Sequence, residues 1–173
     1  MRTHTITEAT TIHAPIDRVF ALSTRIELVQ QTLGMSLIAN ADTITSGHIT
    51  ANARVHWHGW KFGLPTNHHT LITGFAPPHA DHTGNLTAFF QDTQEQGRFA
   101  HFHHDHHFTH LSGSHITTLE DHVFFALPFG PLGAIAARLI LAPHIRRLAR
   151  QRFALIKSLA ETEAWRKWVE PSA

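Results

Sequence analysis

The sequence contains no cysteine and no tyrosine, and only three of its residues are lysine. Without cysteine, the chain can form no disulfide and no thiolate metal site, and it has no cysteine nucleophile. The absence of tyrosine removes the phenol as a catalytic acid. Because a cysteine-free chain is compatible with a reducing compartment, we expect a cytoplasmic location.

Long apolar runs are also missing. A membrane-spanning helix needs about 18 or more consecutive apolar residues, and no such run occurs. Residues 1–15 also lack the apolar core of a secretory signal. We therefore expect no membrane span.

Charge is sparse, with a formal net charge of +1 and 16% charged residues, whereas histidine occurs 18 times. The histidines are scattered over strands and loops, so we attribute most of them to composition rather than to a metal store. The basic residues follow one helix without interleaved aromatics, and no nucleic-acid-binding motif is recognisable. We expect no nucleic-acid partner.

The length and the apolar content favour a single domain. A chain of 173 residues with 42% apolar residues can bury one sizeable core. No internal repeat or second domain is apparent. We expect residues 1–173 to form one domain with an ordered core at about residues 2–166.

The N-terminal third begins with a strand pattern and changes to a helical one. The pattern of a strand is predicted here, in which successive side chains alternate between two faces and one face carries Ile6, Glu8, Thr10 and Ile12. A short helix is predicted after Pro15, and a second over 25–33, ended by Gly34.

Residues from about 37 to 128 have the pattern of strands separated by turn residues. Short connections favour an antiparallel meander, because parallel neighbours need crossovers of a dozen residues or more. The predicted strands are 49–60, 66–76, 85–93, 98–111 and 115–127, and the predicted turns include Gly63-Leu64-Pro65, Pro77-Pro78, Gln96-Gly97 and Ser112-Gly113-Ser114.

After Pro128 the apolar period becomes 3.6 and continues to about Trp165, which predicts one long helix with a kink at Pro143. Before the proline, Leu132, Ile135, Ala136 and Leu139 share a face. After it, the apolar positions are Ile145, Leu148, Ala149, Leu155, Ile156 and Leu159. Together with the strands, this helix predicts an α+β protein whose antiparallel sheet wraps around the helix and leaves an apolar space for a small ligand.

One arginine of this helix falls inside the apolar arc. Arg152 lies near its centre, and a buried guanidinium stays charged and needs an anionic partner. The other cations lie outside the arc, where they are solvated or contact an anionic membrane surface or partner. They are Arg146, Arg147, Arg150 and Lys157.

The final hairpin gathers polar groups on an apolar face. If Ser112-Gly113 is a two-residue turn, His104 lies opposite Asp121. In the same register His106 lies opposite Leu119, Phe102 opposite Val123, and Phe108 opposite Thr117. The other face then places Asp105 opposite Glu120, a repulsive pair that belongs in water.

The candidate site therefore consists of His104, His106, Asp121 and Arg152, walled by Trp57, Phe102, Phe108, Val123 and Phe125. One interpretation is structural: an Asp121–Arg152 ion pair or an Asp121–His104 hydrogen bond fixes the helix on the sheet. In another, these groups orient a ligand or act on it by acid–base chemistry.

A metal site is the third interpretation of the same residues. Histidines at i and i+2 project from one strand face, and an opposing aspartate supplies a third ligand. The spacing is weakly specific in a histidine-rich segment, and no helical H-E-x-x-H supports it. We expect no metal and no cofactor.

Four segments together resemble a known superfamily. They are IHAPIDRVF at 12–20, FQDTQEQGRF at 90–99, HDHHF at 104–108 and EDHVFFALPFGPLG at 120–133. They are similar to the START-like (SRPBCC) superfamily, in particular its bacterial polyketide cyclase/dehydrase-like or coenzyme Q-binding-like branch. The resemblance covers essentially the whole chain. It implies a helix-grip fold, with seven antiparallel strands around the last helix and a cavity for lipids, isoprenoids or polyketides.

Three functions are compatible with these observations. The first is binding or carrying of a hydrophobic small molecule in the cavity. The alternative is a polyketide cyclase/dehydratase-like enzyme, with His104 or His106 as base and Arg152 holding an enolate or carboxylate. The third is an interaction module that uses the basic helix or the outer sheet, including peripheral contact with a membrane.

Overall fold

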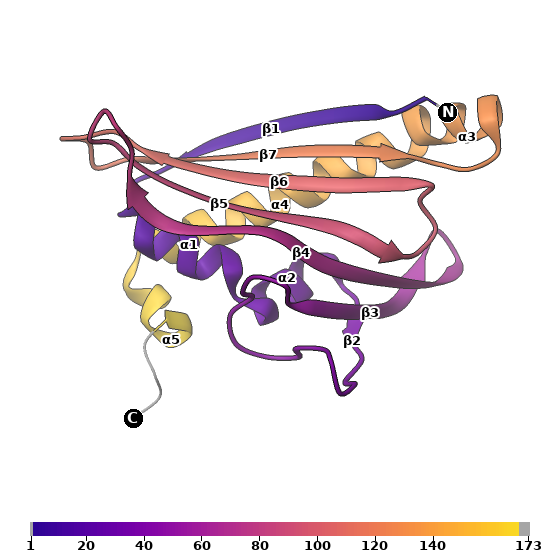
Figure 1. The fold of residues 1–173 in the computed structure, drawn as a ribbon, viewed down its shortest axis with the longest axis horizontal. Coiled ribbons are helices and arrows are strands. Elements are labelled where there is room, and N and C mark those ends of the chain that lie inside the picture. Colours follow the sequence, from indigo (N-terminus) through magenta and orange to yellow (C-terminus); the bar gives the residue numbers. More distant parts are fainter. Residues whose placement is uncertain (1, 170–173) are drawn as a thin grey trace.

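The computed structural model describes residues 2–169, and in these seven strands form one antiparallel sheet (Figure 1). The order across the sheet is β1-β7-β6-β5-β4-β3-β2. Six strands follow one another as neighbours, and β1 closes the sheet beside β7. The strands are β1 (His4–Ile12), β2 (Ser36–Leu37), β3 (Arg54–Lys61), β4 (Leu64–Ala80), β5 (Leu86–Gln96), β6 (His101–His110) and β7 (Thr117–Ala126).

β4 is longer than the sequence predicts and includes the Pro77-Pro78 pair that was expected to form a turn. Its pairing with β5 shifts register at three places, one of them between Ala76 and His79. Proline has no N–H to donate to the ladder, so it is accommodated at such an irregularity. Bulges also bend strands, and the curved sheet leaves a concave face.

Two short helices follow β1, as the sequence predicts. They are α1 (Ile16–Thr24) and α2 (Ile26–Leu33), and α2 ends at Gly34 with a left-handed φ of 59°. Glycine adopts this conformation without a Cβ clash. In Figure 1, α1 and α2 lie beside the long helix on the same side of the sheet.

The C-terminal helical region has three consecutive parts. They are α3 (Gly130–Ala136), a π-helical segment at Ala137–Leu141, and α4 (Ala142–Ala160). The irregularity thus precedes Pro143, because the proline ring crowds the carbonyl four residues earlier and a wider turn relieves that clash. A short 3-10 turn (Glu163–Trp165) and α5 (Arg166–Val169) follow.

The two apolar stretches of this region meet different surroundings. In α4, a helical face points towards the sheet, and its buried positions are Ala142, Ala149, Arg152, Phe153, Ile156 and Ala160. Before Pro143, by contrast, the apolar face is exposed: Leu132 is 75% exposed, Ile135 56% and Leu139 68%. The apolar period before Pro143 therefore predicts a continuous helical face, but it does not show whether that face is buried.

α4 is fixed to the sheet by its buried face and by polar contacts with β1. Arg150 makes two hydrogen bonds to the Glu8 carboxylate, and Lys157 donates to the Thr11 carbonyl. Arg150 therefore has a partner on β1, and its side chain is 68% exposed, as expected of a position outside the apolar arc. Among residues 2–169, no helix has the length and apolarity to cross a membrane.

Candidate functional site

A cavity of about 460 Å³ lies between the sheet and α4, a volume suited to a drug-sized molecule. Most of its lining side chains are apolar and come from α2, the central strands and α4. They include Met35, Trp57, Phe102, Val123, Leu148 and Ala149. Trp57 is buried, and its indole N–H donates to the Thr70 hydroxyl at 3.2 Å.

The cavity is open at one end and filled at the other. Three exposed apolar lining residues mark the mouth: Phe62 and Leu64 of the β3–β4 turn region and Ile140 of the π-helical segment. At the other end, Phe20 of α1 packs edge-on against Phe90 and Phe108. These rings close the space between α1 and the sheet.

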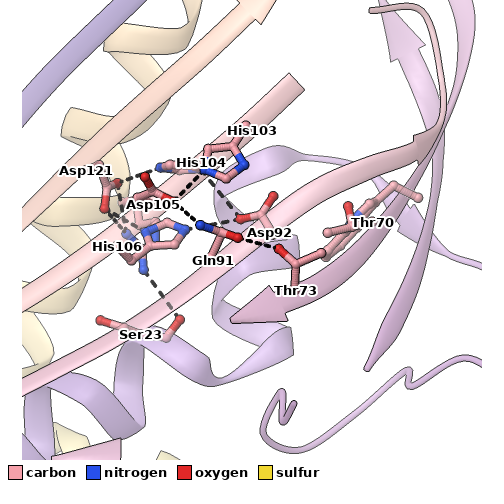
Figure 2. Close-up of polar contacts among 12 residues, drawn as sticks. Ser23, Thr70, Thr73, Gln91, Asp92, His103, His104, Asp105, His106 and Asp121 are labelled. Atoms are coloured by element: carbon pink, nitrogen blue, oxygen red, sulfur yellow. Dashed lines mark hydrogen bonds and ion pairs between the residues drawn. The ribbon is translucent and has the colours of Figure 1, made fainter. Parts of the chain in front are cut away.

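Polar side chains on adjacent strands also line this cavity. The register places Asp92 of β5 opposite His104 of β6, and His106 of β6 opposite Asp121 of β7. Alternation along each strand points all four to the concave face, where they line the cavity together with Arg152 of α4. In Figure 2 the two histidine rings lie between the two carboxylates.

Asp121 has the most contacts of this cluster. Its carboxylate is 3.0 Å from Arg152 Nη1 and 2.6 Å from His106 Nδ1, and its side chain is 1% exposed. His104 Nε2 lies 3.4 Å from Asp121 Oδ2. The aspartate therefore joins α4 to β6 and β7, and it neutralises the buried guanidinium.

The two histidines are stacked and connect Asp121 to Asp92. Their ring centroids are 3.8 Å apart, and the His106 ring also stacks on Phe90 at 4.0 Å. On the side away from Asp121, the Asp92 Oδ1 atom lies 3.3 Å from His106 Nε2 and 3.7 Å from His104 Nδ1. Packing thus fixes both rings.

Charge states follow from burial and neighbours. Burial opposes ionisation of Asp121, yet the nearby His106 and Arg152 hold the pKa of its carboxyl well below the usual range. Burial also opposes ionisation of Asp92, but the hydrogen bond with His106 and the charge of His104 lower the pKa of that carboxyl. For His106, burial and then repulsion from His104 lower the imidazole pKa. Both carboxylates are therefore ionised and His106 is neutral at pH 7.

The hairpin register differs from the prediction by two residues. His106, not His104, lies opposite Asp121; His104 is opposite Val123, Phe102 opposite Phe125, and Phe108 opposite Leu119. Ser112-Gly113 does form the turn, with Ser114 N donating to the Leu111 carbonyl at 3.0 Å. Strand β7 does not begin directly after the turn, because the Ile116 N–H donates a hydrogen bond to the Ser114 hydroxyl instead of to β6.

The predicted pairs on the outer face of the hairpin are also wrong. Asp105 lies opposite His122, and His107 lies opposite Glu120, so the expected repulsive pair of Asp105 with Glu120 does not form. A slip of two residues leaves every side chain on its original face, because the side-chain period of a strand is two. The assignment of inward and outward faces therefore holds.

Seven of the nine candidate residues line the cavity, and two do not. Phe108 is 1% exposed and packs in the aromatic core beneath α1, beyond the filled end. Phe125 is fully buried in a cluster with Ile6, Ala137 and Ala142. Both therefore belong to the packed core rather than to the cavity wall.

Asp92 and His68 also line the cavity, although they were not among the predicted site residues. Asp92 lies two residues after Phe90 and four after Ala88, both buried. The alternation of β5 thus carries the signal for Asp92. His68 gave no such signal, because β4 is irregular and several histidines neighbour it.

No family model and no curated protein matches the sequence. Solved structures of similar fold include a START superfamily protein from Mycobacterium smegmatis, with 12% identity, TM-score 0.62, and coverage of 90% of this chain and 99% of that one. A protein from Thermus thermophilus shows 15% identity, TM-score 0.57, and coverage of 94% of this chain and 97% of that one.

A third similar structure is norcoclaurine synthase from Thalictrum flavum, solved in complex with dopamine and hydroxybenzaldehyde. Its identity is 10%, its TM-score 0.55, and its coverage 90% of this chain and 87% of that one. At these identities the likenesses show the fold. The chain has the START-like helix-grip fold, with a curved seven-stranded antiparallel sheet and a long C-terminal helix.

Proposed function

We propose that this protein binds or carries one hydrophobic small molecule, such as a lipid, an isoprenoid or a polyketide-like compound, in the cavity between the sheet and α4. The observation that carries the proposal is the composition of the cavity lining: apolar side chains form most of it, and Asp92, His104, His106, Asp121 and Arg152 form one polar cluster within it. An apolar body with one oxygen-bearing end matches this composition.

The polar groups of the cavity differ in how fully protein partners already occupy them, and therefore in how well they can contact a ligand. Arg152 is already paired with Asp121 and also lies 3.5 Å from the Ser23 carbonyl, so we assign it a holding role rather than a ligand contact. His104 is the more exposed of the two histidines, at 18% of its side chain, and Asp92 lies beside it. We expect the oxygen of the ligand to lie against Asp92, His104 and His106.

The similar structures give this proposal support of a general kind. The norcoclaurine synthase of similar fold was solved with dopamine and hydroxybenzaldehyde, so this fold accommodates small organic molecules in that protein. Apolar residues at the mouth suit the entry of an apolar molecule. Arg146 and Arg147 are exposed on the same helical region, and they favour exchange of the ligand at an anionic membrane surface.

One observation favours catalysis as a second candidate function. His106 is neutral, and the Asp121 carboxylate at 2.6 Å from Nδ1 orients its ring, which leaves Nε2 as a base facing the cavity. This arrangement suits proton abstraction from a carbonyl compound, as in a polyketide cyclase or dehydratase. Replacement of His106 by Gln would then abolish turnover of such a compound without loss of the folded state.

The binding proposal is tested by filling the cavity. Ala149 of α4 lines the cavity and is 7% exposed, whereas Ala154 is exposed on the same helix. We expect Ala149→Phe to weaken binding of an environment-sensitive apolar dye by about tenfold or more, the effect of about 1.4 kcal/mol. Ala154→Phe is the matched control. Equal dye affinity in a folded Ala149→Phe variant would contradict the proposal.

A further inference from the structure

Three donor atoms meet at one point on the cavity side of the histidine pair. Asp92 Oδ1 is 3.3 Å from His106 Nε2 and 3.7 Å from His104 Nδ1, and all three donors lie within 4.8 Å of one another. Ligands about 2.0–2.1 Å from a tetrahedral Zn²⁺ ion are themselves about 3.3–3.4 Å apart. The observed separations thus suit three ligands on one face of an ion.

Asp121 orients the histidines from the other side. In the tautomer that donates Nδ1–H to Asp121 Oδ1 at 2.6 Å, His106 presents its Nε2 lone pair to Asp92. A carboxylate that accepts the remote N–H of a histidine is the usual outer partner of a metal-bound imidazole. His104 Nε2 lies 3.4 Å from Asp121 Oδ2, and His104 Nδ1 lies 3.7 Å from Asp92 Oδ1.

Asp92 Oδ1 and His106 Nε2 lie within hydrogen-bond distance of each other, at 3.3 Å. Both atoms can also bind a metal ion, the carboxylate oxygen as an anion and the imidazole nitrogen once it carries no proton. A divalent cation between Asp92, His104 and His106 would therefore take the place of the bridging proton, which metal binding would release.

We propose that Asp92, His104 and His106 bind one divalent transition-metal ion of the Zn²⁺ or Fe²⁺ class in the cavity. Two imidazoles and one carboxylate on a single face suit these ions and leave further coordination positions open. The open positions point into the cavity, where an oxygen of the bound molecule would reach the ion. Only this last contact rests on the proposed function; binding of the ion itself does not.

The strands that carry the ligands make the site rigid. β5 and β6 are paired neighbours inside the sheet, and the ligands come from three positions of one cross-strand ladder. Ring stacking between His104, His106 and Phe90 further limits rotation of the imidazoles. The donors are therefore held in place before an ion binds, which favours affinity.

The test is calorimetric titration of chelator-treated protein with Zn²⁺, with free histidine in the buffer to compete for the surface histidines. We expect one tight equivalent per chain. Asp92→Asn and His104→Ala should weaken it by more than about 100-fold, above the 10–100-fold range of outer-partner changes. His103→Ala and His107→Ala, on the outward face of β6, are the controls and should leave it unchanged.

Further measurements distinguish a loss of metal binding from a loss of the folded state and from a failure of the proposed function. Circular dichroism checks that each variant is folded, and visible absorption of the Co²⁺-loaded protein reports a low-symmetry site with nitrogen and oxygen ligands. Weak multi-site binding that Asp92→Asn does not alter would overturn the proposal. If that result accompanies dye binding that Ala149→Phe still weakens, only the metal inference fails. One tight Zn²⁺ equivalent in a protein that binds no apolar dye refutes the proposed function instead.

Discussion

The strand β6 carries histidines on both faces, and their surroundings differ. On the concave face, His104 and His106 lie between the buried Asp121 carboxylate and the partly buried Asp92 carboxylate, beside Arg152. On the convex face, His103 is 2.8 Å from Asp105, and both side chains are partly exposed. The distances are similar on the two faces, but the side chains of His106 and Asp121 are 5% and 1% exposed, whereas those of His103 and Asp105 are 26% and 18% exposed.

This difference decides what each pair contributes. A partly exposed histidine–carboxylate pair is screened by water, and such pairs contribute about 0–1 kcal/mol to stability. A buried pair has lost its hydration, so removing one partner leaves an uncompensated charge. The inner cluster is therefore either an essential lock between helix and sheet or a site kept for a ligand, and the following predictions separate these roles.

The largest expected effect is that of Asp121→Ala. It leaves the buried Arg152 and His106 without their partner, and we expect a loss of about 3–5 kcal/mol in the free energy of unfolding. Asp105→Ala on the outer face should cost about 1 kcal/mol or less. Urea denaturation of both variants measures the difference. Equal losses would show that burial does not distinguish the two faces.

Stability should also fall as the pH falls below about 6.5, partly through His68. Burial lowers the pKa of this cavity-lining imidazole, so the unfolded chain takes up a proton near pH 6.5 that the folded chain does not. The contribution is complete above pH 6.5 and is lost towards acid, with a slope of up to about 1.4 kcal/mol per pH unit. His68→Gln should reduce the measured slope.

Asp92→Asn tests the edge of the cluster. The substitution removes a carboxylate whose ionised form is favoured by the neighbouring His106 and His104, as its lowered pKa indicates. Because the amide can still hydrogen-bond to His106 Nε2, we expect a loss of only about 1 kcal/mol, below that of Asp121→Ala. Thermal unfolding of the metal-free protein provides the measurement. If the loss approached that of Asp121→Ala, Asp92 would belong to the lock between helix and sheet.

The smallest effect belongs to the outer face. His103→Ala removes the contact with Asp105 but leaves that carboxylate near water and the Gln91 amide, and we expect less than about 0.5 kcal/mol. The dye affinity should also be unchanged. A loss as large as that of Asp121→Ala would contradict the contrast between the two faces.

Much of the fold could be predicted because it depends on the spacing of apolar residues and on the turn residues that end each element. The alternation of β1, the stop at Gly34 and the 3.6 period of α4 are local signals, and each predicts its element. The inward face of the final hairpin was also predictable, since it survives a slip of two residues. The register was not, because it depends on the Ser114–Ile116 hydrogen bond, which the turn residues alone do not reveal.

The features of the site that could not be predicted depend on how elements distant in the sequence pack against one another. Phe108 and Phe125 share the inward face of the hairpin, yet α1 and the π-helical region cover them and exclude them from the cavity. Asp92 joins the cluster only through pairing of β5 with β6. Likewise, the apolar face at Leu132 and Ile135 is exposed because nothing in residues 2–169 covers it.

Native mass spectrometry tests the central claim most directly. Wild-type protein and the Ala149→Phe variant would be incubated with a mixed library of fatty acids, isoprenoids and aromatic polyketide-like compounds, and then desalted. The account predicts one retained apolar molecule per wild-type chain and none in the variant. Bare protein in both samples, or equal retention in both, would contradict it.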